Sequence, residues 1–156
     1  MLIAVVGARE TTSAVLVTAE AVGREIGRQG HTIVCGGLTG VMEAACRGAR
    51  SEGGHTIGVL PGDEASTANP YVEFAIPTGL GVARNAVVAR TGDAMIAIDG
   101  SYGTLSEIAF ALQFGRPVVG LGTWTFDDGS SSDPLIRVDS AVDAVDAAIA
   151  AVGGTA

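Results

Sequence analysis

Lysine is absent from this sequence, and all nine basic residues are arginines. A pyridoxal phosphate enzyme needs a lysine to form a Schiff base with its cofactor, and a Walker A loop needs a lysine to contact the phosphates of its nucleotide. The missing lysine therefore excludes both of these protein classes.

Cysteine and histidine are nearly as scarce. Cys35 and Cys46 are the only cysteines, and their spacing matches no metal-binding motif. Cys35 ends an apolar run and Cys46 falls within a helical pattern, so we expect both thiols to be buried structural groups. The two histidines, His31 and His55, begin apolar runs, which places them at the end of a parallel sheet opposite the usual ligand-binding crevice.

A basic leader segment and an apolar run long enough to cross a bilayer are also missing. We therefore expect a cytoplasmic protein that makes no contact with membranes. The formal net charge of -8 argues against nucleic-acid binding, because phosphate backbones require a basic surface. A small anion held by backbone amides is still compatible with this charge.

What the sequence does contain is a regular alternation of short apolar runs and amphipathic helical patterns. It predicts an α/β fold, a single-domain Rossmann-like doubly wound and mostly parallel sheet of six to seven strands with helices on both faces. We expect one domain over residues 1–152 and a frayed tail at 153–156. The predicted strands cover residues 2–6, 31–35, 57–60, 71–76, 93–98, 117–121 and 135–138, and helix caps are predicted at 11–13, Thr104 and Ser140.

Three of the predicted strands end in glycine, and parallel α/β sheets bind ligands beyond such ends. The first end, at Gly7, lacks the other glycines of the G-x-G-x-x-G fingerprint, so a classical NAD enzyme is not expected. The second end is Gly36–Gly37. The third spans Gly100 to Thr104, where the free N–H groups of a new helix favour a phosphate.

Glu107 has two interpretations. It lies three residues after Thr104, which is the spacing of a capping box with a purely structural role. Arg84 and Asn85, however, fall in the first turn of a predicted helix, where the helix dipole disfavours a cation. A solvated arginine explains this position, and so does an arginine that pairs with a ligand phosphate or with Glu107.

Two polar loops interrupt the alternation. Residues 63–70 form a predicted surface loop that could fold over a ligand. The second loop, 122–134, contains Asp127, Asp128 and Gly129, a run more typical of a turn than of a metal site. We expect no metal site in this protein.

Two glycine motifs resemble those of the LONELY GUY family of cytokinin-activating phosphoribohydrolases and its relatives, the molybdenum cofactor carrier proteins. Residues 36–42 are similar to the first glycine motif of the family, and residues 100–107 are similar to its P-G-G-x-G-T-x-x-E signature. Arg84 falls at the spacing of the catalytic arginine of the hydrolases. The resemblance spans most of the chain, from Gly7 to Pro117, and the compact carrier proteins look nearer than the hydrolases.

Three positions depart from this family pattern. Asp99 replaces a proline of the signature, Ser101 replaces its second glycine, and Asn85 replaces the lysine that usually follows the arginine. An inward-pointing Asp99 would repel a phosphate and the missing lysine removes a positive charge, so we expect a larger effect on catalysis than on binding. Relatives are often labelled lysine decarboxylases, but this chain has no lysine to hold the cofactor of that reaction.

The resemblance implies a hydrolase that splits a nucleoside 5′-monophosphate into free base and ribose 5-phosphate. Its catalytic residues would be Glu107, which stabilises the oxocarbenium-like charge or activates water, and Arg84, which keeps Glu107 ionised and contacts the phosphate. The implied ligand-binding residues are Gly7, Ala8, Gly36, Gly37, Thr39, Gly40, Met42, Asn85, Gly100, Ser101, Tyr102, Gly103 and Thr104.

The alternative is a carrier that binds the molybdenum cofactor without turnover, and a nucleotide-binding sensor is a third possibility. The hydrolase would require no cofactor, whereas the carrier would hold the molybdenum cofactor as its bound ligand. Both functions imply a small phosphorylated ligand as partner, together with a homodimer or higher homo-oligomer.

Overall fold

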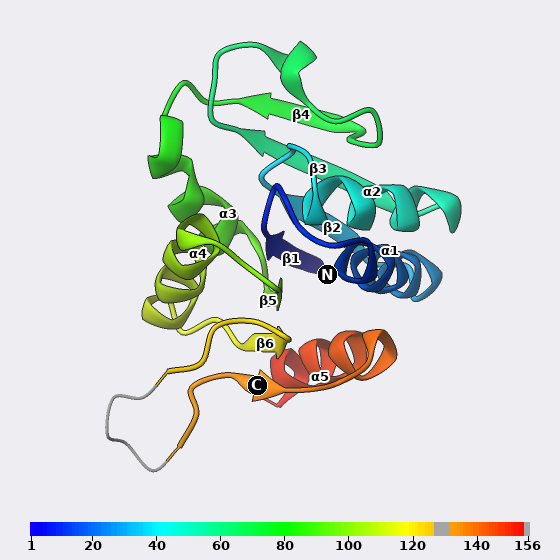
Figure 1. The fold of residues 1–156 in the computed structure, drawn as a ribbon, viewed down its shortest axis with the longest axis vertical. Helices are drawn as coiled ribbons and strands as arrows, with labels where there is room; N and C mark the ends of the chain where they lie inside the picture. The colour runs from blue at the N-terminus through cyan, green and yellow to red at the C-terminus, as the bar shows by residue number, and fades with distance from the viewer. Residues whose placement is uncertain (127–131, 155–156) are drawn as a thin grey trace.

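The structure is a computed structural model that describes residues 1–126 and 132–154 (Figure 1). The strands are β1 (Leu2–Gly7), β2 (Thr32–Cys35), β3 (His55–Leu60), β4 (Phe74–Pro77), β5 (Ala94–Ile98), β6 (Val118–Leu121) and β7 (Ile136–Arg137). Within the described residues they form one sheet in the order β4-β3-β2-β1-β5-β6-β7, and every neighbouring pair is parallel.

Helices cover both faces of this sheet, which confirms the predicted doubly wound α/β fold. On one face lie α1 (Ser13–Arg28), α2 (Val41–Ser51) and α5 (Ala141–Gly153), and on the other lie α3 (Asn85–Thr91) and α4 (Tyr102–Gln113) (Figure 1). The part of the chain that the structure describes also contains two short 3-10 turns, η1 (Ala65–Thr67) and η2 (Gly81–Arg84). No helix in the described residues is long and apolar enough to cross a membrane.

Strand β1 shows how the sheet separates two apolar cores. Its side chains alternate between the faces, so that Ile3 and Val5 pack toward α1, α2 and α5, while Ala4 and Val6 pack toward α3 and α4. All four side chains are almost completely buried. A strand that is buried on both faces reads as a continuous apolar run, which is why this strand was predictable from the sequence.

The strand order reverses between β1 and β5. The chain leaves β1 toward α1 on one face and leaves β5 toward α4 on the other face, so a crevice opens between the two connections at the carboxyl edge of the sheet. His55 begins β3 and His31 directly precedes β2, so both histidines lie at the opposite edge, as predicted.

Helix α4 begins earlier than predicted, and the proposed capping box at Thr104 and Glu107 is wrong. Ser101 is the N-cap and Tyr102 is the first helical residue. The chain turns into this helix through positive φ angles at Asp99 (52°) and Gly100 (145°), which bring residue 101 to the cap position. Thr104 is therefore the third residue of the helix and not its cap, and Glu107 is available for another partner.

Two other predicted segments shift for local reasons. The strand predicted at 71–76 is observed as β4 at Phe74–Pro77, because Val72 N–H donates to Asn69 O in a turn and Thr56 donates its hydroxyl to the Tyr71 carbonyl. The helix predicted at 82–90 is observed as the turn η2 followed by α3. The caps predicted at Thr12 and Ser140 are confirmed by hydrogen bonds to Val15 N–H and Asp143 N–H.

Cys35 and Cys46 are both fully buried, and their sulfur atoms lie 3.6 Å apart as free thiols. The contact with Cys35 and burial raise the pKa of the Cys46 thiol. The prediction that both are structural is consistent with this placement. The acidic run Asp127–Gly129 lies outside the described residues. Among the described residues, no group of three His, Cys, Asp or Glu side chains is placed to hold a metal ion.

Candidate functional site

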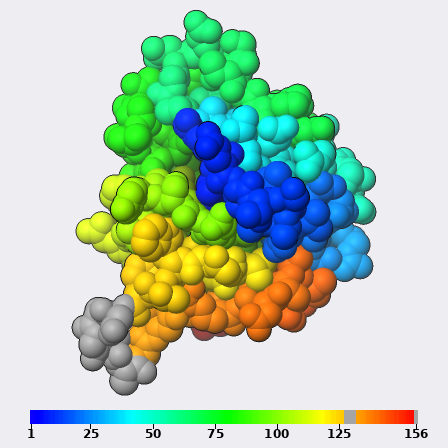
Figure 2. Space-filling view, in the orientation of Figure 1, coloured from blue at the N-terminus to red at the C-terminus, as the bar shows by residue number. Residues whose placement is uncertain are grey.

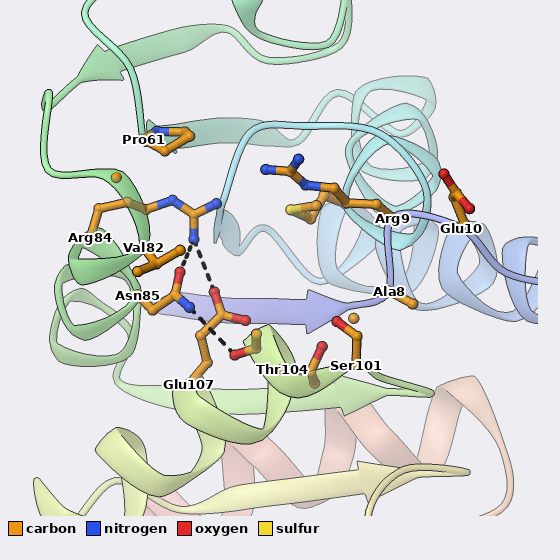
Figure 3. Close-up of a pocket in the computed structure, with 14 residues that line it drawn as sticks. Ala8, Arg9, Glu10, Pro61, Val82, Arg84, Asn85, Ser101, Thr104 and Glu107 are labelled. Carbon is orange, nitrogen blue, oxygen red and sulfur yellow. Dashed lines mark hydrogen bonds and ion pairs between the residues drawn. The ribbon is translucent and has the colours of Figure 1, made fainter.

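A cavity of about 470 Å³ opens at the carboxyl edge of the sheet, at the point where the strand order reverses (Figure 3). Figure 2 shows the loop after β1, in dark blue, on the surface of this face, with green segments on one side of it and cyan segments on the other. Loops from both halves of the sheet therefore meet around the cavity. The lining residues are Gly7, Ala8, Arg9, Glu10, Met42, Pro61, Gly81, Val82, Arg84, Asn85, Ser101, Gly103, Thr104 and Glu107.

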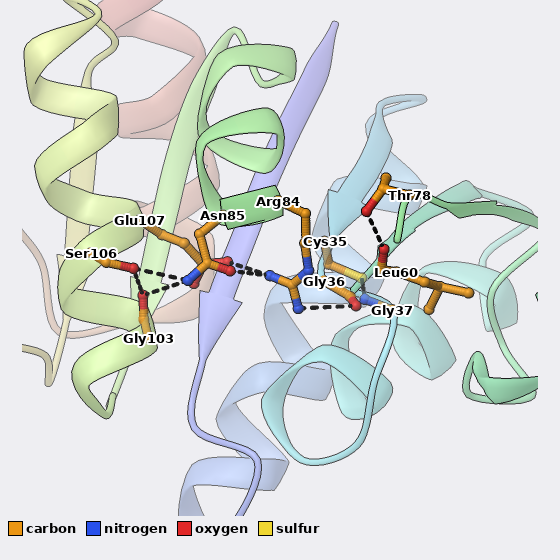
Figure 4. Close-up of polar contacts among 10 residues, drawn as sticks. All are labelled: Cys35, Gly36, Gly37, Leu60, Thr78, Arg84, Asn85, Gly103, Ser106 and Glu107. Carbon is orange, nitrogen blue, oxygen red and sulfur yellow. Dashed lines mark hydrogen bonds and ion pairs between the residues drawn. The ribbon is translucent and has the colours of Figure 1, made fainter. Parts of the chain in front are cut away.

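Arg84 and Glu107 form a buried ion pair in the wall of this cavity, with 3.2 Å between Arg84 Nη1 and Glu107 Oε1 (Figure 4). Arg84 comes from the junction of η2 and α3, and Glu107 comes from the second turn of α4. Each residue is only 6% exposed. The arginine is therefore not a solvated surface residue, and its unfavourable position near a helix start is offset by a carboxylate.

The surroundings of this pair shift both ionisations. Burial raises the pKa of Glu107 to about 7, and the nearby Arg84 charge only partly opposes this effect. Burial also lowers the pKa of Arg84, although the Glu107 charge counteracts the shift. Glu107 can consequently accept or release a proton near neutral pH, which is the property required of a general acid or base.

A chain of hydrogen bonds fixes the orientation of Arg84 (Figure 4). Its Nη2 donates to the Gly36 carbonyl at 3.3 Å, and its Nη1 donates to the Asn85 side-chain oxygen. Asn85 in turn donates to Ser106 Oγ at 2.8 Å, and Ser106 donates to the Gly103 carbonyl at 2.7 Å. The end of β2, the start of α3 and the start of α4 are thus linked through one guanidinium.

The start of α4 forms the floor of the cavity, with Ser101, Gly103 and Thr104 in its lining. Thr104 is 1% exposed, and its hydroxyl has no hydrogen-bond partner within the described chain. A Cβ atom on Gly100 would come within 2.9 Å of the Thr104 side chain, so glycine keeps this turn open. Free N–H groups at a helix start, together with an unpartnered hydroxyl, suit an anionic group.

Asp99 does not line this cavity. Its carboxylate accepts a hydrogen bond of 2.6 Å from Thr11 and faces a second hollow of about 310 Å³ beside α1. The positive φ of Asp99 turns its side chain toward the first loop. The repulsion of a phosphate that an inward-pointing Asp99 would cause is therefore absent from this arrangement.

Several predicted ligand residues support the cavity without lining it. A Cβ atom on Gly36 would come within 2.4 Å of Arg84 Nη2, so this glycine makes room for the guanidinium. Gly40, with a φ of 72°, lies against the backbone of Ala8 and Arg9. The other predicted residues that are not part of the lining are Gly37, Thr39, Gly100 and Tyr102.

Sequence reasoning missed five lining residues, Arg9, Glu10, Pro61, Gly81 and Val82. Arg9 and Glu10 directly follow the predicted pair Gly7–Ala8, and this continuity was the available signal. Pro61 directly follows β3 at the same edge of the sheet as the other strand ends. Gly81 and Val82 carry no local signal, because only the position of η2 brings them to the cavity. The described lining includes none of residues 63–70, the loop that could fold over a ligand.

Comparison with curated proteins finds two kinds of relative. An uncharacterized protein of Archaeoglobus fulgidus is 41% identical over 121 residues, which cover 78% of this chain and 80% of the relative. A cytokinin riboside 5′-monophosphate phosphoribohydrolase of Rhodococcoides fascians is 38% identical over 95 residues, which cover 57% of this chain. The same match covers 47% of the relative, so the chain matches about half the length of that hydrolase.

Solved structures match over nearly the full chain. The molybdenum cofactor binding protein from Rippkaea orientalis has a TM-score of 0.88 at 32% identity, over 97% of this chain and 96% of that chain. The molybdenum cofactor carrier protein from Chlamydomonas reinhardtii has a TM-score of 0.87 at 33% identity, over 98% of each chain.

The family resemblance inferred from the two glycine motifs is confirmed by these matches. The sequence profile of the SLOG cluster4 family also matches residues 1–146. Because this match covers almost the whole chain, the protein belongs to the SLOG cluster4 family.

Proposed function

We propose that this protein binds a phosphorylated, nucleotide-like ligand and hydrolyses the N-glycosidic bond of a nucleoside 5′-monophosphate. The observation that carries this proposal is the buried Arg84–Glu107 pair in the cavity wall, 3.2 Å between charged groups. A carboxylate with a pKa near 7 beside a guanidinium is suited to proton transfer at neutral pH. The similarity to a phosphoribohydrolase supports the same reaction class.

The phosphate of the ligand would lie at the start of α4, where Ser101, Gly103 and Thr104 line the cavity. Helix N–H groups and the Thr104 hydroxyl would donate to its oxygens. This anchoring would hold the sugar in the cavity and position its anomeric carbon near Glu107. The Asn85–Ser106 hydrogen bond would keep α3 and α4 at a fixed separation during this step.

In the reaction, Glu107 would act on the sugar carbon or on water. Its ionised form stabilises the positive charge that develops as the glycosidic bond breaks, and it can also take a proton from the attacking water. Arg84 would stabilise the ionised form of Glu107 and orient it through the bond to Gly36. The products would be a free base and ribose 5-phosphate.

The second candidate is a carrier of the molybdenum cofactor. The observation that favours it is the full-length similarity to a molybdenum cofactor binding protein, over 97% of this chain. The cofactor would be cargo, held through its phosphate at the same helix start, and Glu107 would then orient Arg84 without any chemical step. In either role we expect a homodimer and a cytoplasmic location.

Base release tests the hydrolase directly. We would incubate the protein with the four common ribonucleoside 5′-monophosphates and separate free base and ribose 5-phosphate by chromatography. Glu107→Gln keeps the size of the side chain and should lower the rate roughly 100-fold or more, whereas Glu52→Gln, exposed at the end of α2 and outside the cavity lining, serves as the matched control. Full turnover in Glu107→Gln would remove Glu107 from the mechanism.

Bound material tests the carrier. Protein purified from its native host would be denatured and examined for pterin by fluorescence and mass spectrometry. A stoichiometric pterin phosphate together with no base release would favour the carrier, and a pterin-free protein with rapid base release would eliminate it.

A further inference from the structure

Arg9 lies in the loop between β1 and α1 and lines the cavity. Figure 3 shows its guanidinium extending across the cavity mouth toward Arg84, while the neighbouring Glu10 points away. The backbone of this loop is held in place, because Val41 N–H donates to the Ala8 carbonyl at 3.0 Å and Gly40 packs against the carbonyls of both Ala8 and Arg9. A fixed backbone therefore presents a long, exposed cationic side chain to the cavity.

Arg9 lacks a partner of its own. Within residues 1–126 and 132–154 it makes no hydrogen bond, ion pair or ring contact, although the chain has 17 acidic residues for nine arginines. Most of the other arginines pair with a carboxylate, as Arg84 pairs with Glu107 and Arg47 pairs with Glu20. An unpaired cation directed at a cavity is available to a ligand.

The electrostatics of the cavity favour an anion between the two arginines. Burial is the main cause of the lowered pKa of Arg84, and the positive charge of Arg9 lowers it further because like charges repel. Glu107 offsets this repulsion only in part, because burial opposes its ionisation. A phosphate monoester carries a charge of about -1.5 to -2 at pH 7 and would compensate both cations.

We propose that Arg9 is a specificity residue that binds the phosphoryl group and selects phosphorylated ligands over their dephosphorylated counterparts. This inference rests on the proposed function, and it adds a second guanidinium, beside Arg84, to a site whose donors at the start of α4 are neutral. Arginine is suited to the task because its planar donor pair matches two phosphate oxygens.

Calorimetric titration with ribose 5-phosphate and with ribose tests the inference without any turnover, and inorganic phosphate serves as a third probe. Arg9→Gln should weaken ribose 5-phosphate binding roughly 10- to 100-fold and leave ribose binding unchanged, because a charge-assisted contact is lost. Arg9→Lys keeps the charge and should show a smaller loss. Arg90→Gln, which removes the same charge from an exposed position on α3, should match the wild type.

Three outcomes of these titrations would overturn the proposed role of Arg9. A ribose 5-phosphate affinity in Arg9→Gln within twofold of the wild type would overturn it, as would a wild type that binds neither ribose 5-phosphate nor inorganic phosphate. An equal loss for ribose and ribose 5-phosphate would also overturn it, because the residue would then act on the whole cavity. If phosphate binding depends on Arg9 but the protein releases no base, the proposed hydrolase function is wrong and the inference about Arg9 is supported.

Discussion

Among individual residues, Glu107 couples the stability of the fold to pH. Its folded-state pKa of about 7 lies above the usual 4.5, so the folded protein holds the proton more tightly than the unfolded chain does. The resulting stabilisation is fully present below pH 4.5 and is lost as the pH rises to about 7. Over this window the wild type should lose about 3 kcal/mol of unfolding free energy relative to Glu107→Gln.

Urea unfolding of both proteins at intervals from pH 4.5 to 8 measures this difference. Comparison with Glu107→Gln cancels the titration of all groups that the substitution leaves untouched. A difference between the two unfolding free energies that stays constant across the window would contradict the assignment of a raised pKa to Glu107.

Substitution of Thr104 should affect ligand binding and protein stability in opposite directions or leave stability unchanged. Its hydroxyl is buried without a partner, so Thr104→Val removes a desolvated polar group and should leave the unfolding free energy unchanged or raise it by about 1 kcal/mol. Affinity for ribose 5-phosphate should nevertheless fall roughly tenfold, because the ligand loses a donor. Calorimetry and urea unfolding measure the two effects.

Thr91→Val is the matched control for this substitution. Its hydroxyl donates to the Val87 carbonyl on α3, away from the cavity, so this variant should bind ribose 5-phosphate as the wild type does. A Thr104→Val protein with unchanged affinity would exclude the hydroxyl from the phosphate site.

The pairing of Arg84 with Glu107 was predictable, because an arginine at a helix start calls for a nearby anion. Arg9 was not predictable in the same way. Nothing in the local sequence shows that its side chain crosses the cavity mouth, since that depends on Gly40 holding the first loop against α2. The direction of Asp99 was also beyond sequence reasoning, because it follows from a positive φ at a residue other than glycine.

Among the elements, the loop after β1 depends on the start of α2. Gly40 has a φ of 72°, and a Cβ atom there would lie 2.3 Å from the Ala8 carbonyl oxygen. Gly53, with a φ of 75° and nothing within 4 Å of a Cβ atom, carries the same backbone strain without the clash. Gly53→Ala should cost about 1 kcal/mol of unfolding free energy, and Gly40→Ala should cost about 2 to 4 kcal/mol.

Urea unfolding and ribose 5-phosphate titration of the two variants check this prediction. Gly40→Ala should also weaken ligand binding, because it displaces the loop that carries Arg9. Equal losses of unfolding free energy in both variants would show that the contact between Gly40 and the Ala8 carbonyl does not restrict the side chain at this position.

The elements themselves were largely predictable, because strands buried on both faces appear as apolar runs and the helices carry a clear apolar stripe. The start of α4 was misplaced because Thr104 and Glu107 have the spacing of a capping box, whereas the backbone turn at Asp99 and Gly100 selects Ser101 as the cap. β4 begins later than predicted because the Tyr71 carbonyl accepts a hydrogen bond from the Thr56 hydroxyl and does not pair within the sheet.

The molecule as a whole exposes apolar side chains beside the cavity. Leu80 at the start of η2 is 52% exposed, and Val82 on η2 is 85% exposed. Tyr102 at the start of α4 is 82% exposed. Exposed apolar groups gathered near a site are typical of a subunit interface. Light scattering after size exclusion should give about 31 kDa, twice the chain mass of 15.6 kDa.

Val82→Asp should shift this assembly toward the monomer, while Val17→Asp on α1, 65% exposed, should not. A wild type that elutes at the mass of one chain at micromolar concentration would contradict the predicted homodimer.

The position of the crevice followed from the alternation of strands and helices, because a doubly wound sheet opens at its carboxyl edge where the strand order reverses. The ligand-facing side chains of this crevice did not follow from the same pattern, since they come from loops whose lengths carry no periodic signal.

The guanidinium of Arg84 joins a carbonyl at the tip of β2 to a carboxyl on α4, and thereby spans both sides of the reversal between β1 and β5. A ligand that competes for this group would replace one of the hydrogen bonds that it makes to Gly36, Asn85 and Glu107. Ligand binding would then weaken the contact between the end of β2 and α4. Amide hydrogen exchange at Gly37 would report this as a change in protection.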